Sequence, residues 1–429
     1  MRIVYVSQWF EPEPNNSKTE ALLNGLIAEG ARVTVLTGFP NYPGGKLYPG
    51  YRIRLFQREI LKGFEVHRVP LYPSHNRSSV GRIANYSSFF LSSLIYGLVN
   101  KRKFDLAYVY HPPITVGLAV CLWGLLGRVP FVIDIQDLWP DSVAASDMAG
   151  VKVLSGMLNG VCNFVYRRAA RILVQCPGMK HKLLERGVPA DKIAVVYNWT
   201  DEEAFEAPSD FSLPFLEEPD AFNLIYAGNF GRAQNCETLI RAVALATERL
   251  PKLRLLMIGD GVEEQRLRAV VAELGAANIC FHSRVARSSM AAIYPRADAL
   301  VCTLTRQELF AHVIPSKTQA YMAAGRPILM AVEGDAARLI VEAGAGIAVP
   351  PEDPAALADA IARMVQMPRE QREAMGRAGR AYYDAHLSFA CGMALTLSEI
   401  RGAAGDASLE PRQVSPAPSR QAKAGQGIT

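Results

Sequence analysis

The feature that most constrains the fold is an alternation of short apolar runs with helical segments, which occurs twice along the chain. Apolar runs of this length between helical segments are typical of strands buried on both faces of a parallel sheet. In the first half, the candidate strands are RIVYVS, RVTVLTG, FEVHRVP, LAYVYHP, PFVIDIQD, RILVQC and IAVVYN. In the second half, they are FNLIYAGN, LRLLMIGDG, NICFHSRV, ALVCTLT, PILMAV and AGIAVP. The pattern therefore predicts an α/β protein with two doubly wound, Rossmann-like domains.

The boundaries follow from where this alternation stops. Residues 201–221 are acidic, contain prolines and have no apolar period, so they are interpreted as a linker. It separates a first domain over 1–200 from a second over 222–385, and a C-terminal helix is expected over 386–404. Residues 405–429 are rich in small, polar and proline residues, which is typical of a disordered tail. Because ligands of such sheets bind beyond the carboxyl ends of the strands, we expect the two domains to face each other across a cleft.

Cysteine usage and charge narrow the class of protein. The seven cysteines form no CxxC pair and no Cys/His cluster, so we expect reduced thiols in a cytoplasmic protein and no metal site. Residues 1–200 contain 23 Lys and Arg against 13 Asp and Glu, whereas residues 201–429 contain 23 against 28. The first domain is therefore the one expected to meet an anionic surface or substrate, a basic solvated face being the alternative.

Two apolar helical segments lie in the first half. Both residues 86–103 and residues 113–127 fall short of the ~20 residues that a membrane span requires. Segment 86–103 ends in Lys101, Arg102 and Lys103, and an apolar helix with a basic end favours a position in a membrane interface. For 113–127 a buried core helix is favoured.

The first β–α turn, QWFEPEPNN, contains no glycine, which argues against a dinucleotide site there. Ser17 and Glu20 have the spacing of a capping box at the start of the following helix. The free amides of that helix start can bind an anion, so Asn16 and Ser17 are candidate acceptor-binding residues. A capped helix without a ligand is the alternative.

The second domain contains two candidate phosphate sites. In YAGNFGRAQNCETLIRA, the glycines Gly228 and Gly231 allow a close backbone approach, and Arg232 offers a charged donor. Asn229 lies between the glycines and is a further donor-binding candidate. A structural turn with a surface arginine competes with this interpretation.

The second site is the helix start in FAHVIPSKTQAYMAAGRPILM, where Pro315 precedes Ser316 and Lys317. Because the helix macrodipole disfavours a cation in the first turn, Lys317 indicates a bound anion. Together with the amides of 312–317 it would cradle a diphosphate, a solvated lysine being the alternative.

The segment FVIDIQDLWPDS places acidic residues at the end of a strand. Asp137 there can accept a proton or orient a hydroxyl group. Asp134 lies within the strand and is better explained as a structural carboxylate. His111, His282 and His312 are single histidines, which are more often packed than catalytic.

At these motifs the chain resembles the family 4 glycosyltransferases, which have the GT-B fold of two facing α/β domains. The similarity covers about residues 1–400. It is carried by TGFPNYPGGKLYPGYR, DIQDLWPDS, AGNFGRAQNCETLIRA, VIPSKTQAYMAAGRPIL and AGAGIAVPPEDPAALADAI. The chain is most similar to bacterial members that build exopolysaccharide or O-antigen units on undecaprenyl diphosphate, including fucosyl- and N-acetylfucosaminyltransferases.

This resemblance implies that the first domain takes the acceptor, with Trp139 near it, and that the second takes a UDP- or GDP-linked sugar. The loop at Gly228–Arg232 and the helix start at Ile314–Lys317 would hold the donor diphosphate, with His312, Pro315 and Ser316 beside it. The base would be read beyond the strand near 278–285, which makes Arg284 a candidate.

The resemblance further implies transfer with retention of configuration and without a metal or other cofactor. Asp137, Arg232 and Lys317 are then the candidate catalytic residues, the two cations stabilising the leaving diphosphate. The helix over 386–404 would cross back to the first domain.

The chain departs from the family pattern at several positions. Asn229 and Gln234 stand where many members have Arg and Lys, so we hypothesise that Arg232 replaces the lost charge. His312 and Ala320 stand where many members have glutamates, and the second of these commonly holds the ribose. Asp137 stands at the strand end where many members carry a catalytic histidine.

The sequence therefore predicts a retaining glycosyltransferase that works on a polyprenyl-diphosphate-linked acceptor in surface polysaccharide biosynthesis. We expect it to lie on the inner face of the bacterial cytoplasmic membrane, with an anionic membrane surface as a partner and no nucleic acid. An epimerase-like GT-B enzyme, a non-catalytic sugar-binding protein and a degenerate transferase acting as a scaffold are the alternatives.

Overall fold

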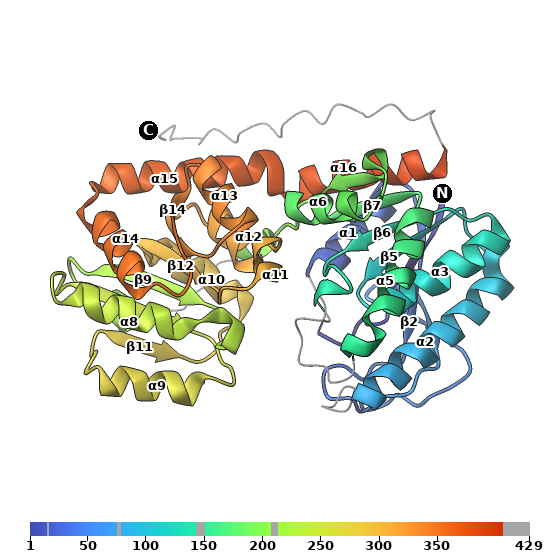
Figure 1. Cartoon of the computed structure of the whole chain (residues 1–429), viewed down its shortest axis with the longest axis horizontal. Helices are drawn as coiled ribbons and strands as arrows, with labels where there is room; N and C mark the ends of the chain where they lie inside the picture. Colours follow the sequence, from blue (N-terminus) through green and yellow to red (C-terminus); the bar gives the residue numbers. More distant parts are fainter. Residues whose placement is uncertain (15–16, 75–78, 143–150, 207–212, 406–429) are drawn as a thin grey trace, which may run out of the picture.

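The computed structural model describes residues 1–14, 17–74, 79–142, 151–206 and 213–405. Two α/β domains lie side by side along the long axis of the molecule (Figure 1). The elements of the first domain are β1 (Arg2–Val6), α1 (Ser17–Ala28), β2 (Arg32–Gly38), β3 (Gln57–Leu61), β4 (Phe64–Val69), α2 (Ser79–Asn100), β5 (Leu106–His111), α3 (Ile114–Gly127), β6 (Phe131–Ile135), α5 (Val151–Arg168), β7 (Arg171–Val174), α6 (Pro177–Glu185) and β8 (Ile193–Val195).

The first sheet has the strand order β3-β4-β2-β1-β5-β6-β7-β8. All pairs are parallel except β3 with β4. The seven strands expected in this half are confirmed; the central strands are buried on both faces, whereas β4 and β8 are partly exposed. Strand β3 was not predicted: its sequence, QREIL, is mostly polar and lies at the sheet edge. It pairs with β4 through a two-residue turn at Lys62 and Gly63, whose φ angles of 49° and 85° fit a tight hairpin.

The second sheet has the order β11-β10-β9-β12-β13-β14 and is parallel throughout. The first strand of this domain, β9, therefore lies in the middle of the sheet, and the doubly wound prediction is confirmed. The elements are β9 (Phe222–Ala227), α8 (Cys236–Thr247), β10 (Leu253–Ile258), α9 (Glu264–Glu273), β11 (Ile279–His282), α10 (Met290–Ile293), β12 (Ala299–Thr303), α11 (Glu308–Ala311), α12 (Ser316–Ala323), β13 (Ile328–Ala331), α13 (Asp335–Glu342), β14 (Gly346–Val349), α14 (Pro354–Gln366) and α15 (Arg369–Tyr382), and they are followed along the chain by α16 (Phe389–Ala404). A short helix, α7 (Glu203–Glu206), lies in the connection between the domains.

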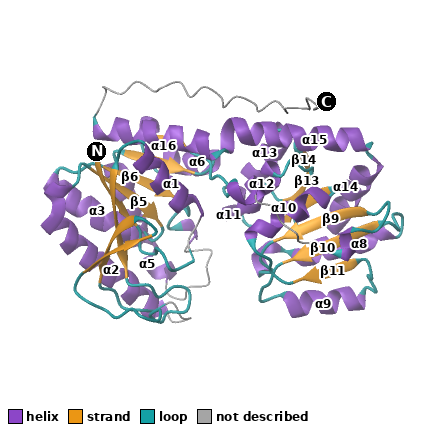
Figure 2. Cartoon of the chain, turned by 180° about the vertical axis from the view of Figure 1, so that it is seen from behind, coloured by secondary structure: helices purple, strands orange, loops and turns teal. Residues whose placement is uncertain are grey.

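The last helix, α16, belongs spatially to the first domain. It packs against α1 and against β5, β6 and β7, while α15 lies on the second domain (Figures 1 and 2). Met393 and Ile400 of α16 are buried in the same core cluster as Tyr5 and Leu22. A Cβ atom on Gly25 of α1 would lie 2.7 Å from the Met393 sulfur, so the two helices pack closely. The chain therefore crosses between the domains twice.

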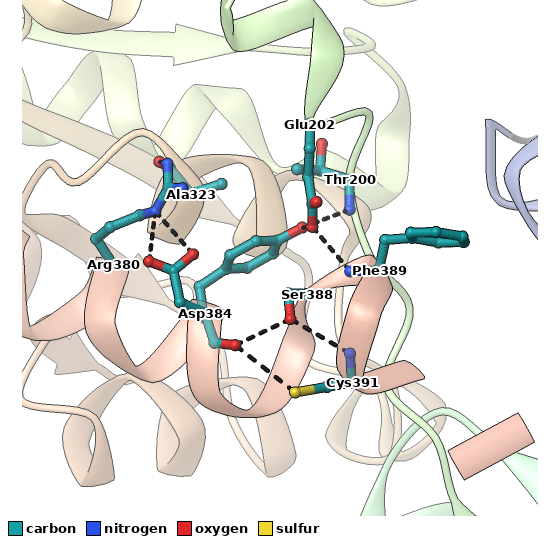
Figure 3. A network of polar contacts seen from close by, with 9 residues as sticks. Thr200, Glu202, Ala323, Arg380, Asp384, Ser388, Phe389 and Cys391 are labelled. Atoms are coloured by element: carbon teal, nitrogen blue, oxygen red, sulfur yellow. Dashed lines mark hydrogen bonds and ion pairs between the residues drawn. The ribbon is translucent and has the colours of Figure 1, made fainter. Parts of the chain in front are cut away.

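The two crossings are joined by hydrogen bonds around one tyrosine (Figure 3). The Tyr383 hydroxyl donates to Oε1 of Glu202 at 2.8 Å and accepts from the amide of Thr200 at 3.2 Å. The amide of Phe389 donates to the same Glu202 oxygen at 2.8 Å. These hydrogen bonds thus hold the linker after β8 against the start of α16.

Candidate active site

The centre of the second sheet is where a ligand site is expected. Strands β9 and β12 are neighbours, but the chain leaves them toward opposite sides of the sheet. Ligands of open α/β sheets bind at such switch points, beyond the carboxyl ends of the strands. The loop over 228–235 follows β9 and the segment over 304–315 follows β12, so both predicted phosphate motifs flank this point.

Two glycine-containing loops pack directly on each other at this edge. The amide of Gly228 donates to the carbonyl of Ile258 at 2.9 Å, and the amide of Phe230 donates to that of Asp260 at 2.7 Å. A Cβ on Gly259 would lie 1.8 Å from the Gly228 carbonyl oxygen, and one on Gly261 would lie 2.4 Å from that of Phe230. This second loop was not predicted as part of the site, although its Gly-Asp-Gly sequence follows β10 directly.

Side chains from neighbouring strands fix the loop that carries Asn229 and Gln234. The Tyr226 hydroxyl donates to the Asn229 carbonyl at 2.8 Å, and the Thr303 hydroxyl donates to the Gln234 carbonyl at 2.6 Å. Gly231 lies against Asn229, because a Cβ at that position would be 2.8 Å from Nδ2 of Asn229. The loop geometry is therefore set before any ligand arrives.

The Lys317 ammonium group lies inside this loop. Its Nζ donates to Oε1 of Gln234 at 3.1 Å and lies 3.9 Å from the centre of the Tyr226 ring. A Cβ on Gly228 would be 3.0 Å from Nζ, so glycine leaves the space that the lysine occupies. Burial lowers the pKa of Lys317. Among the described residues no carboxylate forms an ion pair with it.

The helix that carries Lys317 is oriented toward the same place. Helix α12 begins at Ser316, after Pro315, as predicted, and the amide of Thr318 donates to the Pro315 carbonyl at 2.8 Å. The Tyr321 hydroxyl accepts a hydrogen bond from the amide of Ala227 at 3.0 Å, which ties α12 to the end of β9. Ser316 is exposed, whereas Ile314 is buried beneath the helix start. The positive end of α12 and the Lys317 ammonium are thus adjacent.

The two predicted arginines differ from Lys317 in their surroundings. The Arg232 guanidinium is 86% exposed and pairs with Glu263 at 3.3 Å. Arg284 is exposed and pairs with Asp260 at 2.8 Å. Each arginine therefore already has a carboxylate partner, so Lys317 is the cation of the three whose charge is not balanced by a described side chain.

His312 lies at the contact between the domains. Its carbonyl accepts a hydrogen bond from the Cys176 sulfur at 3.0 Å, and a Cβ on Gly178 would lie 2.5 Å from its Nδ1. Beside it, the amide of Gly178 donates to Oδ2 of the buried Asp335 at 2.6 Å. The start of α6 in the first domain thus contacts both His312 and α13, a contact that the sequence did not reveal.

The strand end in the first domain contains a structural carboxylate and an exposed one. Asp134 is buried, pairs with Lys18 at 2.9 Å and accepts a hydrogen bond from the Tyr108 hydroxyl at 2.8 Å, which confirms the structural interpretation. Asp137 is exposed at the strand end, and the protein atoms around it raise its pKa by desolvation. Of the two, Asp137 is the one that a substrate can reach.

The other residues predicted to bind the acceptor are Asn16, Ser17 and Trp139, and of these the structure describes the side chain of Trp139. Asn16 and the side chain of Ser17 lie outside the described residues, and Glu20 forms an ion pair with Lys62 at 3.0 Å. Trp139 is partly exposed, and its ring lies 5.9 Å from that of His111. His111 is fully buried and its burial lowers its pKa to about 3, so it is a packed histidine as expected.

Comparisons with known proteins agree with this arrangement. The family model for "Glycosyl transferase 4-like domain" matches residues 16–199, and that for "Glycosyl transferases group 1" matches residues 213–382. The chain therefore belongs to the glycosyltransferases with the GT-B fold, with a 4-like first domain and a group 1 second domain.

Among curated proteins, WcaI of Escherichia coli (strain K12), a putative colanic acid biosynthesis glycosyl transferase, is 25% identical over 375 residues. This match covers 84% of the chain and 91% of WcaI. WbjE of Pseudomonas aeruginosa, a probable glycosyltransferase, is 27% identical over 246 residues, 55% of the chain and 60% of WbjE.

Among solved structures, HepE of Anabaena in complex with UDP has a TM-score of 0.66 at 16% identity and covers 93% of this chain and 100% of its own. WaaG, a glycosyltransferase involved in lipopolysaccharide biosynthesis, has a TM-score of 0.64 at 14% identity with coverage of 93% and 100%. At these identities the likeness concerns the fold.

Proposed function

We propose that this enzyme is a retaining glycosyltransferase that moves a sugar from a nucleoside-diphosphate sugar to an acceptor linked to a lipid diphosphate, in the biosynthesis of a bacterial surface polysaccharide. Binding of a nucleoside-diphosphate sugar is supported by the position of Lys317 at the switch point of the second sheet. Its ammonium group is desolvated and donates a hydrogen bond to the uncharged amide oxygen of Gln234. A charge in this setting is costly unless an anion balances it, and a donor diphosphate is such an anion. A role in surface polysaccharide biosynthesis is supported by the similarity to WcaI, a putative colanic acid biosynthesis glycosyl transferase.

UDP is the favoured nucleotide. HepE, which shares the fold over nearly the whole chain, was solved with UDP, with UDP and glucose, and with UDP-glucose. Ala320 cannot hydrogen-bond a ribose, so the nucleoside has to be held by other groups of the chain. A fucose-type or N-acetylamino sugar remains our proposal for the transferred group.

In the proposed reaction the C–O bond between the sugar and the diphosphate breaks, and the acceptor hydroxyl attacks the anomeric carbon on the same face and gives its proton to the departing diphosphate oxygen. Negative charge then grows on the leaving diphosphate, where the Lys317 ammonium and the amides at the start of α12 stabilise it. Asp137, whose pKa is raised by desolvation, is placed to accept a hydrogen bond from a hydroxyl of a bound sugar. We propose that Arg232 and Arg284 line the outer side of the donor site and that no metal ion is needed.

The proposal that the acceptor is linked to a membrane lipid is supported by the surface of α2. Its side chains at Val80, Leu91, Ile95 and Val99 are between 54% and 78% exposed, an unusual density of bare aliphatic groups. Lys101, Arg102 and Lys103 follow directly. We propose that this face rests on an anionic membrane at its cytoplasmic side. Among the described residues no helix has the length and apolarity needed to cross a bilayer.

Vesicle binding tests this membrane face. Substituting Val99→Glu removes one aliphatic group and adds a repelling charge, so binding to anionic phosphatidylglycerol vesicles at low salt should weaken by roughly tenfold or more. The matched control is Val262→Glu, which changes an 84% exposed valine in the second domain. If both variants co-sediment with vesicles as the unmodified protein does, the α2 surface is not the membrane face.

The donor assignment is tested by a thermal-shift screen against UDP, GDP, their sugar conjugates and NAD. A ligand present at ~100 times its Kd stabilises the folded state by roughly 2.7 kcal/mol. A shift with one nucleoside diphosphate series, followed by sugar transfer to a farnesyl-diphosphate-linked sugar in EDTA with retained anomeric configuration, is the expected result. If none of the nucleotides raised the melting temperature, the proposed transferase function would be refuted.

A further inference from the structure

Four aromatic side chains gather at the carboxyl edge of the first sheet. Trp9 follows β1, Tyr42 follows β2, Trp139 follows β6, and Tyr86 comes from α2. The Trp9 ring lies 5.2 Å from Tyr42 and 6.4 Å from Tyr86, and Tyr86 lies 6.2 Å from Trp139. Each ring centre is thus within ordinary contact distance of another, and the four form one continuous aromatic cluster.

The aromatic cluster lies at the margin of the hydrophobic core, against which Trp139 packs. All four of its residues are partly exposed, whereas Trp123 and Trp199 are only 1% and 5% exposed. The cluster also lies at the point where a ligand is expected, because β1 is the strand at which the order of the first sheet reverses. Trp139 lies two residues after Asp137, on the loop whose Leu138 and Asp141 line a cavity of about 290 Å³ facing the second domain.

A buried polar network holds the backbone that carries these rings. The carboxyl group of Glu13, 2% exposed, accepts hydrogen bonds from the amides of Phe10 at 3.1 Å, Asn41 at 2.6 Å and Tyr42 at 2.7 Å. It therefore joins the loop of Trp9 to the loop of Tyr42.

A second part of this network reaches α2. The Asn85 side chain donates to Oδ1 of Asn41 at 3.3 Å and to the Tyr72 carbonyl at 2.7 Å, and it accepts a hydrogen bond from Gln8. Asn85 immediately precedes Tyr86, so the helix is tied to both loops. These buried hydrogen bonds join the loops of Trp9 and Tyr42 to α2, and they hold the backbone that carries the rings.

We propose that this aromatic cluster binds a pyranose ring of the acceptor. The proposal rests on the glycosyltransferase function above and names how that enzyme recognises its acceptor. The C–H groups on one face of a pyranose carry partial positive charge and fit the negative face of an aromatic ring. The hydroxyl groups of Tyr42 and Tyr86 can exchange hydrogen bonds with the hydroxyls at the edge of the sugar.

A sugar fits the cluster better than the lipid part of the acceptor. The bare aliphatic surface that suits a hydrocarbon lies on α2 at Leu91, Ile95 and Val99, which carry no polar atoms. The aromatic cluster instead combines ring faces with two phenol groups and an indole N–H at each tryptophan. Small-molecule sites that combine apolar walls with a few polar groups are typical of specific ligand recognition.

Intrinsic fluorescence offers a direct test, because two of the four tryptophans are buried and the other two belong to the cluster. The probes are methyl glycosides of glucose, galactose and fucose at millimolar concentration, with no nucleotide present. We expect at least one glycoside to change the emission and to protect it from acrylamide, and we expect Trp9→Phe to reduce that change. If UDP or GDP shifts the melting temperature but no glycoside changes the emission, the cluster proposal is wrong while the transferase function stands.

Kinetics then assigns the sugar to the acceptor. In Tyr86→Ala and in Trp139→Ala, the KM for a farnesyl-diphosphate-linked sugar should rise about three- to tenfold, while the KM for the donor and the nucleotide-induced thermal shift stay unchanged. Tyr86→Phe keeps the ring and should retain most of the acceptor affinity, which separates stacking from a folding defect. Phe164→Ala, at a 38% exposed aromatic of α5, is the matched control. A rise in the KM for the donor alone would place the donor sugar on the cluster and overturn the proposal.

Discussion

Replacing Lys317 with methionine tests two effects of its charge, one on the stability of the free enzyme and one on the affinity for the donor. Methionine keeps an unbranched stem against Tyr226 but removes the charge. The ammonium contacts one amide oxygen at 3.1 Å and the Tyr226 ring face at 3.9 Å, and no carboxylate of the described part of the chain pairs with it. With a bound diphosphate, the same group would form charge-assisted hydrogen bonds. The substitution should therefore stabilise the free enzyme and weaken donor binding.

The size of each effect is estimated separately for the free enzyme and for the enzyme with bound nucleotide. Replacing buried ionic groups by apolar ones of similar volume often stabilises by about 1–4 kcal/mol, and the lower end applies because the cation–π contact is lost as well. About 1 kcal/mol corresponds to roughly 2–4 °C in melting temperature for a domain of this size. A hydrogen bond to a charged group contributes about 2 kcal/mol, so the nucleotide Kd should rise about 30-fold.

Thermal shift with UDP or GDP measures both effects in one experiment. At a nucleotide concentration of ~100 times the Kd of the unmodified protein, the stabilisation should drop from about 2.7 to about 0.9 kcal/mol in Lys317→Met. Lys252→Met is the control, since this exposed lysine of the second domain pairs with Asp220 of the linker. Lys317→Met with a nucleotide shift as large as that of the control would refute the assignment of Lys317 to the diphosphate.

Three further predictions concern the framework of the site. Lys18→Met leaves the Asp134 carboxylate buried without its cation, so the free energy of unfolding in urea should fall by about 3–5 kcal/mol; a loss below ~1 kcal/mol would show that the ion pair is not structural. Burial raises the pKa of Glu13 to about 7, so the folded protein binds a proton that the unfolded chain has already released, and stability should fall by about 3 kcal/mol between about pH 5 and pH 8. That loss should be absent in Glu13→Gln, and parallel pH curves for the two proteins would contradict it. Gly259→Ala forces a Cβ to within 1.8 Å of a carbonyl oxygen and should cost about 3 kcal/mol and impair nucleotide binding, whereas Gly275→Ala, with φ of 61° but open space around it, should cost about 1 kcal/mol in chemical denaturation.

The parts of the structure that could be predicted are those that depend on local pattern. Thirteen of the strands were visible because each contains a short run of mainly apolar residues between helical segments. Strand β3 was missed because an edge strand needs no such run. Lys317 was found because a cation in a first helical turn conflicts with the macrodipole, a signal that is local in sequence.

The parts that could not be predicted depend on residues far apart in the chain. The contact between Gly178 and Asp335 joins positions 157 residues apart, and nothing near either residue indicates it. The aromatic cluster likewise draws Trp9 and Trp139 from separate strand ends. The sequence analysis considered Trp139 alone, because the pairing of loops is set by the strand order and not by the residues of any one loop.

The position of α16 has a consequence for how the protein is made. Met393 and Ile400 complete a core whose other members, such as Tyr5 and Leu22, lie within the first 200 residues. A ribosome synthesises the chain from the N-terminus at about 5–20 residues per second. The first domain must therefore wait, with an apolar side of α1 and of the β5–β7 region uncovered, until the whole second domain has emerged. During that interval of roughly ten seconds or more, the nascent chain presents a binding surface for a chaperone.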